Sequence, residues 1–329
     1  MTRSYYISAY ATSPSVDPWD LEMESRYFQR LAENQNIAGI EHPFLMNTDR
    51  YPVDFLKDHI PAHWSLTMTT LPFMMQMSNK NASFGLASME DVSRKAAVKG
   101  IAELRDYVCR LHDIFGRQLV RAVHIHSSPK NTDKDQKGNV SCFQHSLSDL
   151  KKMGWDGIDL NLEHCDAYIP KKKSEKGFLG LESEIEAISK IGGFGIILNW
   201  ARSAIEGRSL ETAVAHIELT KKYDLLKGFF FSSCTSNPLS IYGAWQDTHM
   251  PPKRFIEDAY LDNDSLLGQK EIRRVFSCLD ERVYLGIKVH DPQEDKCVET
   301  SVGLNFGTLN AIEAAMSDSF ETQRGRPLI

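Results

Sequence analysis

The fold of this chain is most readily predicted from residues 157–166, GIDLNLEHCD. Apolar and polar side chains alternate through this stretch, as in a β-strand whose two faces meet different surroundings. If Leu160 and Leu162 pack beneath helices, then Asn161 and Glu163 face the other way. The stretch therefore predicts a strand with a polar inner face that ends in a carboxylate.

Seven further runs rich in apolar and β-branched residues surround this strand. We predict strands over residues 5–11, 37–44, 64–70, 119–127, 194–202, 228–234 and 284–291. Helices are predicted over residues 91–115, 209–223, 267–279 and 308–316. Ser183 with Glu186 predicts a capping box that opens the helix after the fifth strand.

Eight strand-then-helix units predict an α/β protein that folds as a (β/α)8 TIM barrel, with residues 1–329 in a single domain. A doubly wound open sheet is the main alternative, but no GxGxxG motif follows the first strand. Residues 128–140, 167–182 and 235–266 each follow a strand and are too long for simple connections. We expect them to lie as lid-like loops over the C-terminal face of the barrel.

Strand parity places an unusual number of polar side chains inside the barrel. The inward residues near the strand ends are Glu41, His124, His126, Glu163, Asn199, Lys288 and His290, with Asn161 one layer deeper. In the seventh strand, parity leaves Ser232 and Ser233 as alternatives. Because unpaired ionisable groups cost several kcal/mol each to bury, and barrel interiors are normally apolar, this set predicts a functional site.

Four of these residues are candidates for catalysis. Glu163 suits a general base or a metal ligand, although an ion pair with Lys288 is the structural alternative. Glu41 and His290 are candidates for a second acid or base. Lys288 is a candidate for stabilising a developing enediolate, or for a Schiff-base nucleophile.

Other side chains suit the binding of a hydroxyl-rich substrate. Histidines and amides donate and accept hydrogen bonds, an aromatic ring offers a platform, and Arg202 suits a carboxylate or a phosphate. The predicted substrate-binding residues are His124, His126, Asn161, Asn199, Arg202, Trp245, Asp247 and His249. Satisfied core histidines and a well-packed loop are the structural alternatives for this set.

Three segments carry a resemblance to known families. Residues 60–65, IPAHWS, and 242–247, YGAWQD, resemble an uncharacterised bacterial protein family of unknown function. Residues 162–164, LEH, resemble the strand-end glutamate that ligates a divalent metal in the xylose-isomerase-like TIM-barrel superfamily. The resemblance implies a barrel with sugar isomerase or epimerase chemistry.

The sequence departs from that superfamily at its other metal ligands. Those enzymes place an acidic residue at strand six, a histidine at strand seven and a glutamate at strand eight. Here the matching strand ends carry Asn199, a serine, and Lys288 with His290. A divalent metal (Mn, Mg or Zn) would therefore need another set, such as Glu163 with His124 and His126, or with Glu41.

The composition argues against some classes of binding partner. The net charge of −6 argues against nucleic acid, and the absence of a long apolar run argues against a membrane span. The six cysteines form no CxxC pair and the start lacks a signal-peptide pattern, so the cytoplasm is the expected compartment. We expect a small-molecule carbohydrate as partner, and homo-oligomerisation stays open.

The sequence thus predicts an enzyme that acts on a sugar, sugar acid or sugar phosphate by proton transfer next to a carbonyl. An isomerase, an epimerase or a lyase would each fit. One alternative is a glycosidase-like hydrolase that uses Glu163 and Glu41 as a carboxylate pair. A second alternative is a non-catalytic sugar-binding barrel.

Overall fold

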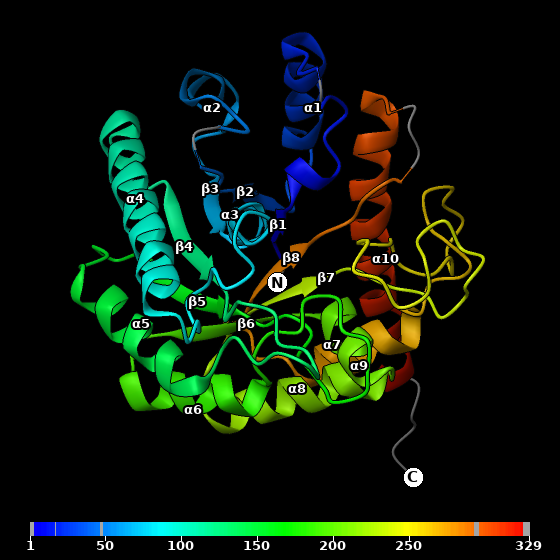
Figure 1. Ribbon diagram of the computed structural model, residues 1–329. Helices are drawn as coiled ribbons and strands as arrows, with labels where there is room; N and C mark the ends of the chain where they lie inside the picture. Colours follow the sequence, from blue (N-terminus) through cyan, green and yellow to red (C-terminus); the bar gives the residue numbers. More distant parts are fainter. Residues whose placement is uncertain (1–2, 17, 47–48, 293–295, 325–329) are drawn as a thin grey trace.

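Eight parallel strands close into a barrel in chain order (Figure 1). The computed structural model describes residues 3–16, 18–46, 49–292 and 296–324. The strands are β1 (Tyr5–Ile7), β2 (Ile37–Pro43), β3 (Ser65–Thr69), β4 (Val120–Ile125), β5 (Asp159–Glu163), β6 (Gly195–Asn199), β7 (Leu226–Phe231) and β8 (Tyr284–Ile287). Because β1 pairs with both β2 and β8, the sheet has no free edge. The predicted (β/α)8 TIM barrel is confirmed, and the open sheet is excluded.

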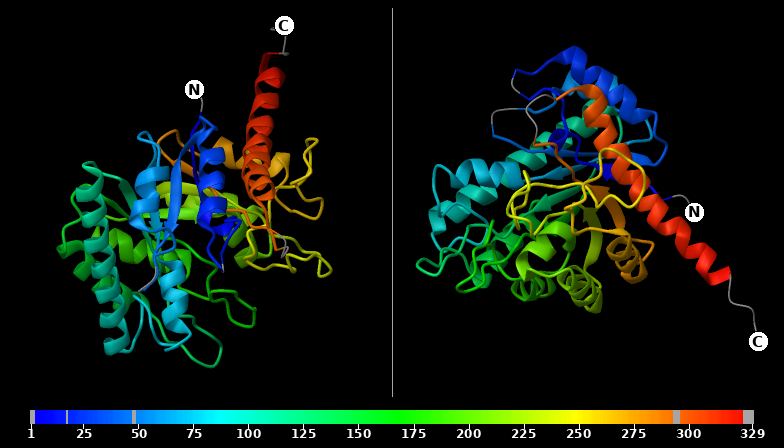
Figure 2. Two further views of the ribbon diagram at one scale, coloured as in Figure 1. Left: turned by 90° about the horizontal axis from the view of Figure 1, so that it is seen from above. Right: turned by 90° about the vertical axis from the view of Figure 1, so that its right-hand side faces the viewer.

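Helices surround the strands (Figure 1). They are the 3-10 helix η1 (Ala9–Ala11) and the α-helices α1 (Leu21–Ala32), α2 (Val53–His59), α3 (Leu71–Ser78), α4 (Asp91–Phe115), α5 (Val140–Lys152), α6 (Leu181–Ile191), α7 (Trp200–Gly207), α8 (Glu211–Lys222), α9 (Gln269–Cys278) and α10 (Val298–Arg324). Figure 2 shows α10 beside α1, with its C-terminal part extending beyond the neighbouring helices. In the part of the chain that the structure describes, no helix combines the length and apolar character needed to cross a membrane.

The strand faces follow the predicted parity. Leu160 and Leu162 pack in the main hydrophobic core, whereas the amide of Asn161 reaches across the barrel to the hydroxyl of Tyr284 on β8, at 3.3 Å. A small apolar layer fills the barrel beneath the polar side chains, and it comprises Tyr6, Ala122, Ile197, Phe230 and Tyr284. The site is therefore carried on a packed floor at the carboxyl ends of the strands.

The predicted sixth strand, residues 194–202, is too long. β6 ends at Asn199 and α7 begins at Trp200, because the side chain of Asn199 accepts a hydrogen bond from the backbone amide of Arg202, at 3.3 Å. Asparagine is among the preferred N-cap residues of helices, because its side chain accepts a hydrogen bond from a backbone amide that the first turn leaves unpaired. Arg202 therefore lies in the first turn of a helix.

Two helix predictions also need correction. Ser183 lies inside α6, which begins at Leu181, and the N-cap residue Gly180 has no side chain that could cap the helix. The helix predicted over residues 308–316 is only the middle of α10, which begins ten residues earlier. Long loops follow β4, β5 and β7, over residues 126–139, 164–180 and 232–268.

Candidate active site

Glu163, the last residue of β5, lies at the centre of a buried hydrogen-bond network. Its Oε2 lies 2.9 Å from Nε2 of His126 and 3.4 Å from Oγ1 of Thr69. Its Oε1 accepts a short hydrogen bond from Nη1 of Arg202. The side chains of Glu163 and Arg202 are 1% and 0% exposed, so this ion pair is shielded from water.

Arg202 connects the barrel to two of the long loops. Its Nε donates to Oδ2 of Asp247, at 3.1 Å, and Nζ of Lys176 lies 3.3 Å from the same oxygen. Nδ1 of His249 lies 3.2 Å from the other oxygen of Asp247. The loops after β5 and β7 therefore meet over the end of Glu163 through charged contacts.

Glu41, on β2, forms a second buried pair with Lys288, which follows β8. Nζ of Lys288 lies 3.0 Å from Oε2 of Glu41, and the hydroxyl of Ser8 donates to the same oxygen, at 2.6 Å. Nδ1 of His124 lies 3.4 Å from Oε1. The ring of Tyr10 covers the ammonium of Lys288 at 5.3 Å from the ring centre, in a cation–π arrangement.

Gly39 allows β2 to lie close to β3 near Glu41. A Cβ at Gly39 would lie 1.7 Å from the carbonyl oxygen of Ser65 on β3, and the residue has φ of 155°. Only glycine adopts that conformation without strain and allows such an approach. The close pairing of β2 with β3 therefore fixes Glu41 beside the barrel axis.

The two ion pairs set the protonation states of the carboxylates. Burial alone would raise the pKa of Glu41, but the ammonium of Lys288 outweighs it and lowers the pKa to about 2. Burial opposes ionisation of Glu163 as well, yet Arg202 and Lys288 hold its pKa well below the usual range. Burial lowers the pKa of His249 to about 3, despite the nearby Asp247. Glu41 and Glu163 are thus carboxylates at neutral pH, and His249 is neutral.

The remaining inward residues line the floor and one side of the candidate site. Nε2 of His124 lies 2.8 Å from the hydroxyl of Tyr284, which also accepts from Asn161. The hydroxyl of Ser232 donates to Oδ1 of Asn199, at 2.7 Å. Ser233 instead bonds within the loop after β7, so Ser232 is the inward residue of the two alternatives.

Several buried polar atoms at this end of the barrel make no hydrogen bond within the described residues. They include Nη2 of Arg202, Nδ2 of Asn199 and Oγ1 of Thr67, as well as Oε1 of Glu41 and Nδ1 of His124. A buried donor without a partner costs about 1–3 kcal/mol, so such atoms are rare unless they serve a ligand or water. Nη2 of Arg202 belongs to the guanidinium that bonds Glu163, so this end of the barrel is a candidate binding site.

Two predicted site residues lie apart from this network. Nδ1 of His290 bonds to the carbonyl oxygen of Ala11, at 2.7 Å, because β8 ends at Ile287 and parity no longer applies beyond it. The ring of Trp245 stacks with the guanidinium of Arg208 at the edge of the loop after β7. Neither makes a described contact with Glu41, Glu163 or Lys288.

The site is a closed interior rather than an open mouth. Glu41, Glu163 and Lys288 are all at most 1% exposed. Asp247, paired with Lys176, lies against Arg202, and the ring of Tyr10 lies over Lys288. Lys176, Tyr10 and Ser8 are not among the site residues predicted from the sequence, since strand parity does not single out residues outside the strands. A substrate can reach Glu163 only if these segments move.

A group compact enough for one metal ion also lies here. Ligand atoms of Glu41, His124 and Glu163 all lie within 4.8 Å of one another. His126 is outside this group, although its Nε2 lies 2.9 Å from Oε2 of Glu163. Of the metal ligands considered from the sequence, Glu163, His124 and Glu41 are the three brought together.

The barrel is similar in fold to several solved structures. An L-ribulose 3-epimerase is 12% identical, with a TM-score of 0.59, over 99% of this chain and 100% of that one. A xylose isomerase domain containing protein from Salmonella typhimurium LT2 is 11% identical, with a TM-score of 0.61, over 95% and 97%. IOLI protein with a zinc atom is 12% identical, with a TM-score of 0.59, over 95% and 99%. At these identities the shared property is the fold.

Residues 6–304 match a family described as Domain of unknown function (DUF4862), and the chain belongs to this family. It is also 29% identical over 287 residues to Uncharacterized protein STM3670 of Salmonella typhimurium (strain LT2), across 87% of this chain and 89% of that protein. The resemblance to an uncharacterised family and to the xylose-isomerase-like barrels is thus confirmed.

Proposed function

We propose that this protein catalyses proton transfer next to the carbonyl group of a sugar, sugar acid or sugar phosphate. The observation that carries the proposal is the buried group of Glu163, Glu41, Lys288 and Arg202 at the carboxyl ends of the strands, where barrel enzymes act. Similar folds among sugar epimerases and isomerases support the substrate class. Isomerisation and epimerisation both begin with this proton transfer.

Glu163 acts as the base in this proposal. Glu163 is ionised in the network described above, so its carboxylate can take the proton from the carbon beside the carbonyl. The electron pair moves onto the carbonyl oxygen, and the ammonium of Lys288 stabilises the resulting enediolate. Glu41 holds that ammonium in place through the contact of 3.0 Å. The free donors of Arg202 and Asn199 bind substrate oxygens.

The residues of the barrel site do not fit a divalent metal. Each carboxylate already has a cation, since Lys288 is paired with Glu41 and Arg202 with Glu163. An ion among Glu41, His124 and Glu163 would add two positive charges beside an ammonium and a guanidinium, in a medium that screens them poorly. We therefore assign the role of charge stabilisation to Lys288.

The glycosidase alternative lacks a suitable acid. Such enzymes need one carboxyl group with a raised pKa that protonates the leaving oxygen. Glu41 and Glu163 instead both have lowered pKa values, because each is paired with a cation. The non-catalytic alternative predicts that a sugar binds without any exchange of its protons.

Replacing Glu163 with glutamine is expected to lower turnover by about 10²–10⁴-fold, because the amide cannot accept the proton. The measurement is the incorporation of deuterium from D2O into ketoses, aldoses, uronates and sugar phosphates, followed by proton NMR. Glu182→Gln, an exposed glutamate on α6, is the matched control and should keep full activity. Equal exchange by the wild type and by folded Glu163→Gln would refute the role of Glu163.

A further inference from the structure

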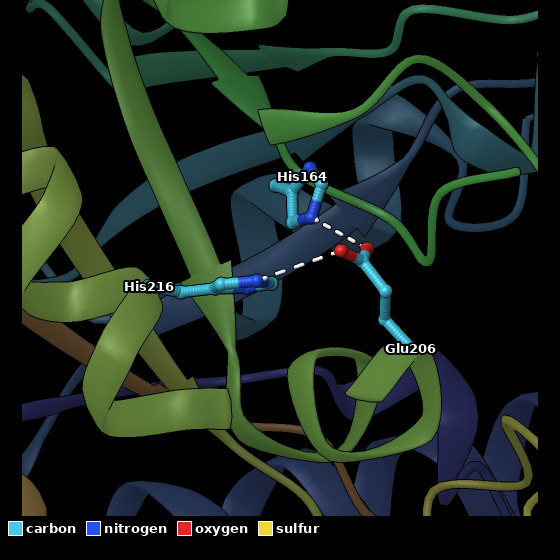
Figure 3. A group of neighbouring side chains, drawn as sticks. All are labelled: His164, Glu206 and His216. Atoms are coloured by element: carbon cyan, nitrogen blue, oxygen red, sulfur yellow. Dashed lines mark hydrogen bonds and ion pairs between the residues drawn. The ribbon is translucent and has the colours of Figure 1, made fainter. Parts of the chain in front are cut away.

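We propose that His164, Glu206 and His216 form a zinc site outside the barrel (Figure 3). His164 directly follows β5, Glu206 lies near the end of α7, and His216 lies in α8. Figure 3 shows the two imidazoles directed at the carboxylate of Glu206 from different elements. This group is separate from the proposed catalytic residues and does not depend on them.

The distances suit a single tetrahedral ion. Nε2 of His164 lies 3.0 Å from Oε2 of Glu206, and Nε2 of His216 lies 3.5 Å from Oε1. All three ligand atoms lie within 4.8 Å of one another. Bonds of about 2.0–2.2 Å to Zn²⁺ require tetrahedral ligand atoms to be roughly 3.4 Å apart. An ion therefore needs only small side-chain shifts, and water completes the coordination.

Both histidines are already oriented as metal ligands. Nδ1 of His164 lies 2.6 Å from Oε2 of Glu184, and Nδ1 of His216 lies 3.0 Å from the hydroxyl of Ser203. Metal-bound histidines nearly always use their second nitrogen in this way, which fixes the ring and directs the other nitrogen at the ion. Glu184 is itself held by a short hydrogen bond from Ser127.

The charges of the cluster also favour a divalent ion. Glu184 and Glu206 supply two carboxylates, whereas an imidazolium at His164 would supply one positive charge. Zn²⁺ bound by two neutral imidazoles balances both carboxylates. Among the described residues, no lysine or arginine forms an ion pair with the carboxylate of Glu206, although the ammonium of Lys172 donates to the backbone oxygen of Glu206. Two nitrogen ligands and one carboxylate suit zinc better than magnesium or calcium.

The ion can reach the cluster from solvent. The side chains of Glu206 and His216 are 12% and 11% exposed, although His164 is fully buried. The site is also placed to support the barrel network. Glu163 and His164 lie on opposite faces of the strand end, and α7 contacts both. Arg202 in its first turn binds Glu163, and Glu206, one turn later, binds His164. The proposed zinc ion therefore lies at the junction between the end of β5 and α7.

The experiment is a competition titration of the metal-stripped full chain with Zn²⁺ and a chromophoric chelator. We expect one tight site per chain, and a tetrahedral visible spectrum when Co²⁺ replaces Zn²⁺. His216→Gln should weaken zinc affinity at least about 100-fold and abolish that spectrum. His145→Gln, an exposed histidine on α5, should leave both unchanged.

Ser203→Ala provides a test that does not remove a ligand. It should weaken zinc affinity about 10–100-fold through the loss of the contact to His216. The proposal is overturned if the chain binds no zinc, if neither variant alters the affinity, or if anomalous scattering at the zinc edge locates the ion beside Glu41 and Glu163. A peak between His164 and His216 would support it.

Discussion

Replacing Arg202 with methionine is expected to lower the free energy of unfolding by about 3–5 kcal/mol, the cost of removing one partner of a buried ion pair. Glu163 would keep only its contacts with His126 and Thr69, and Asp247 would keep Lys176. Both carboxylates are at most 2% exposed, so water cannot replace the guanidinium. Equilibrium unfolding in urea at pH 7 measures the loss.

The matched control for Arg202 is Arg282→Met. Arg282 and its partner Asp224 are each 82% exposed and lie 3.7 Å apart. Exposed pairs contribute about 0–1 kcal/mol, so this variant should unfold almost as the wild type does. The double variant Arg202→Met/Glu163→Gln should recover part of the loss, since it removes one stranded charge. Equal stability of Arg202→Met and Arg282→Met would contradict the buried network.

Replacing Lys288 with methionine should produce a similar loss of about 3–5 kcal/mol at pH 7, and this loss should depend on pH. Lys288 holds the pKa of Glu41 at about 2, below its usual value of 4.5, so the pair stabilises the wild type above pH 4.5 and loses its effect towards pH 2. Without the ammonium, burial raises the pKa of Glu41. The variant should therefore approach the wild type in stability as the pH falls below 4.5.

Urea unfolding at several pH values measures this difference. Lys227→Met is the control, because Lys227 is exposed and its ammonium contacts only a backbone oxygen of Asp224, at 3.3 Å. The double variant Glu41→Gln/Lys288→Met should be more stable than Lys288→Met alone at pH 7. A loss for Lys288→Met that stays constant from pH 7 to pH 3 would show that Glu41 is not its partner.

The barrel and its inward residues could be predicted because strand parity is a local property. Alternation in residues 157–166 placed Asn161 and Glu163 on the axis, and the same argument placed Glu41 and His124. Parity failed for His290, because it applies only within a strand and β8 ends at Ile287. The end of β6 is set by Asn199, the N-cap residue of α7, and the apolar pattern of the sequence does not reveal this cap.

The partners of these residues could not be predicted, because they come from distant segments. Lys176 and Asp247 lie 71 residues apart in the sequence, yet their side chains form an ion pair. Asp247 also pairs with Arg202, which binds Glu163. The group of His164, Glu206 and His216 joins a strand end with two helices, and no short motif connects them. The closure of the site likewise depends on how loops pack, which leaves no periodic signal.

In the proposed reaction, Glu163 takes the proton and Lys288 stabilises the enediolate, without a metal among the barrel carboxylates. The most direct test is deuterium incorporation from D2O into the panel of carbohydrates, with wild-type protein and with Lys288→Met, in the presence and absence of a strong chelator. We predict exchange at the carbon next to the carbonyl that persists with chelator and disappears in folded Lys288→Met. Exchange that requires an added divalent metal even in folded His216→Gln, which lacks a ligand of the proposed zinc site, or that Lys288→Met retains, would contradict this proposal.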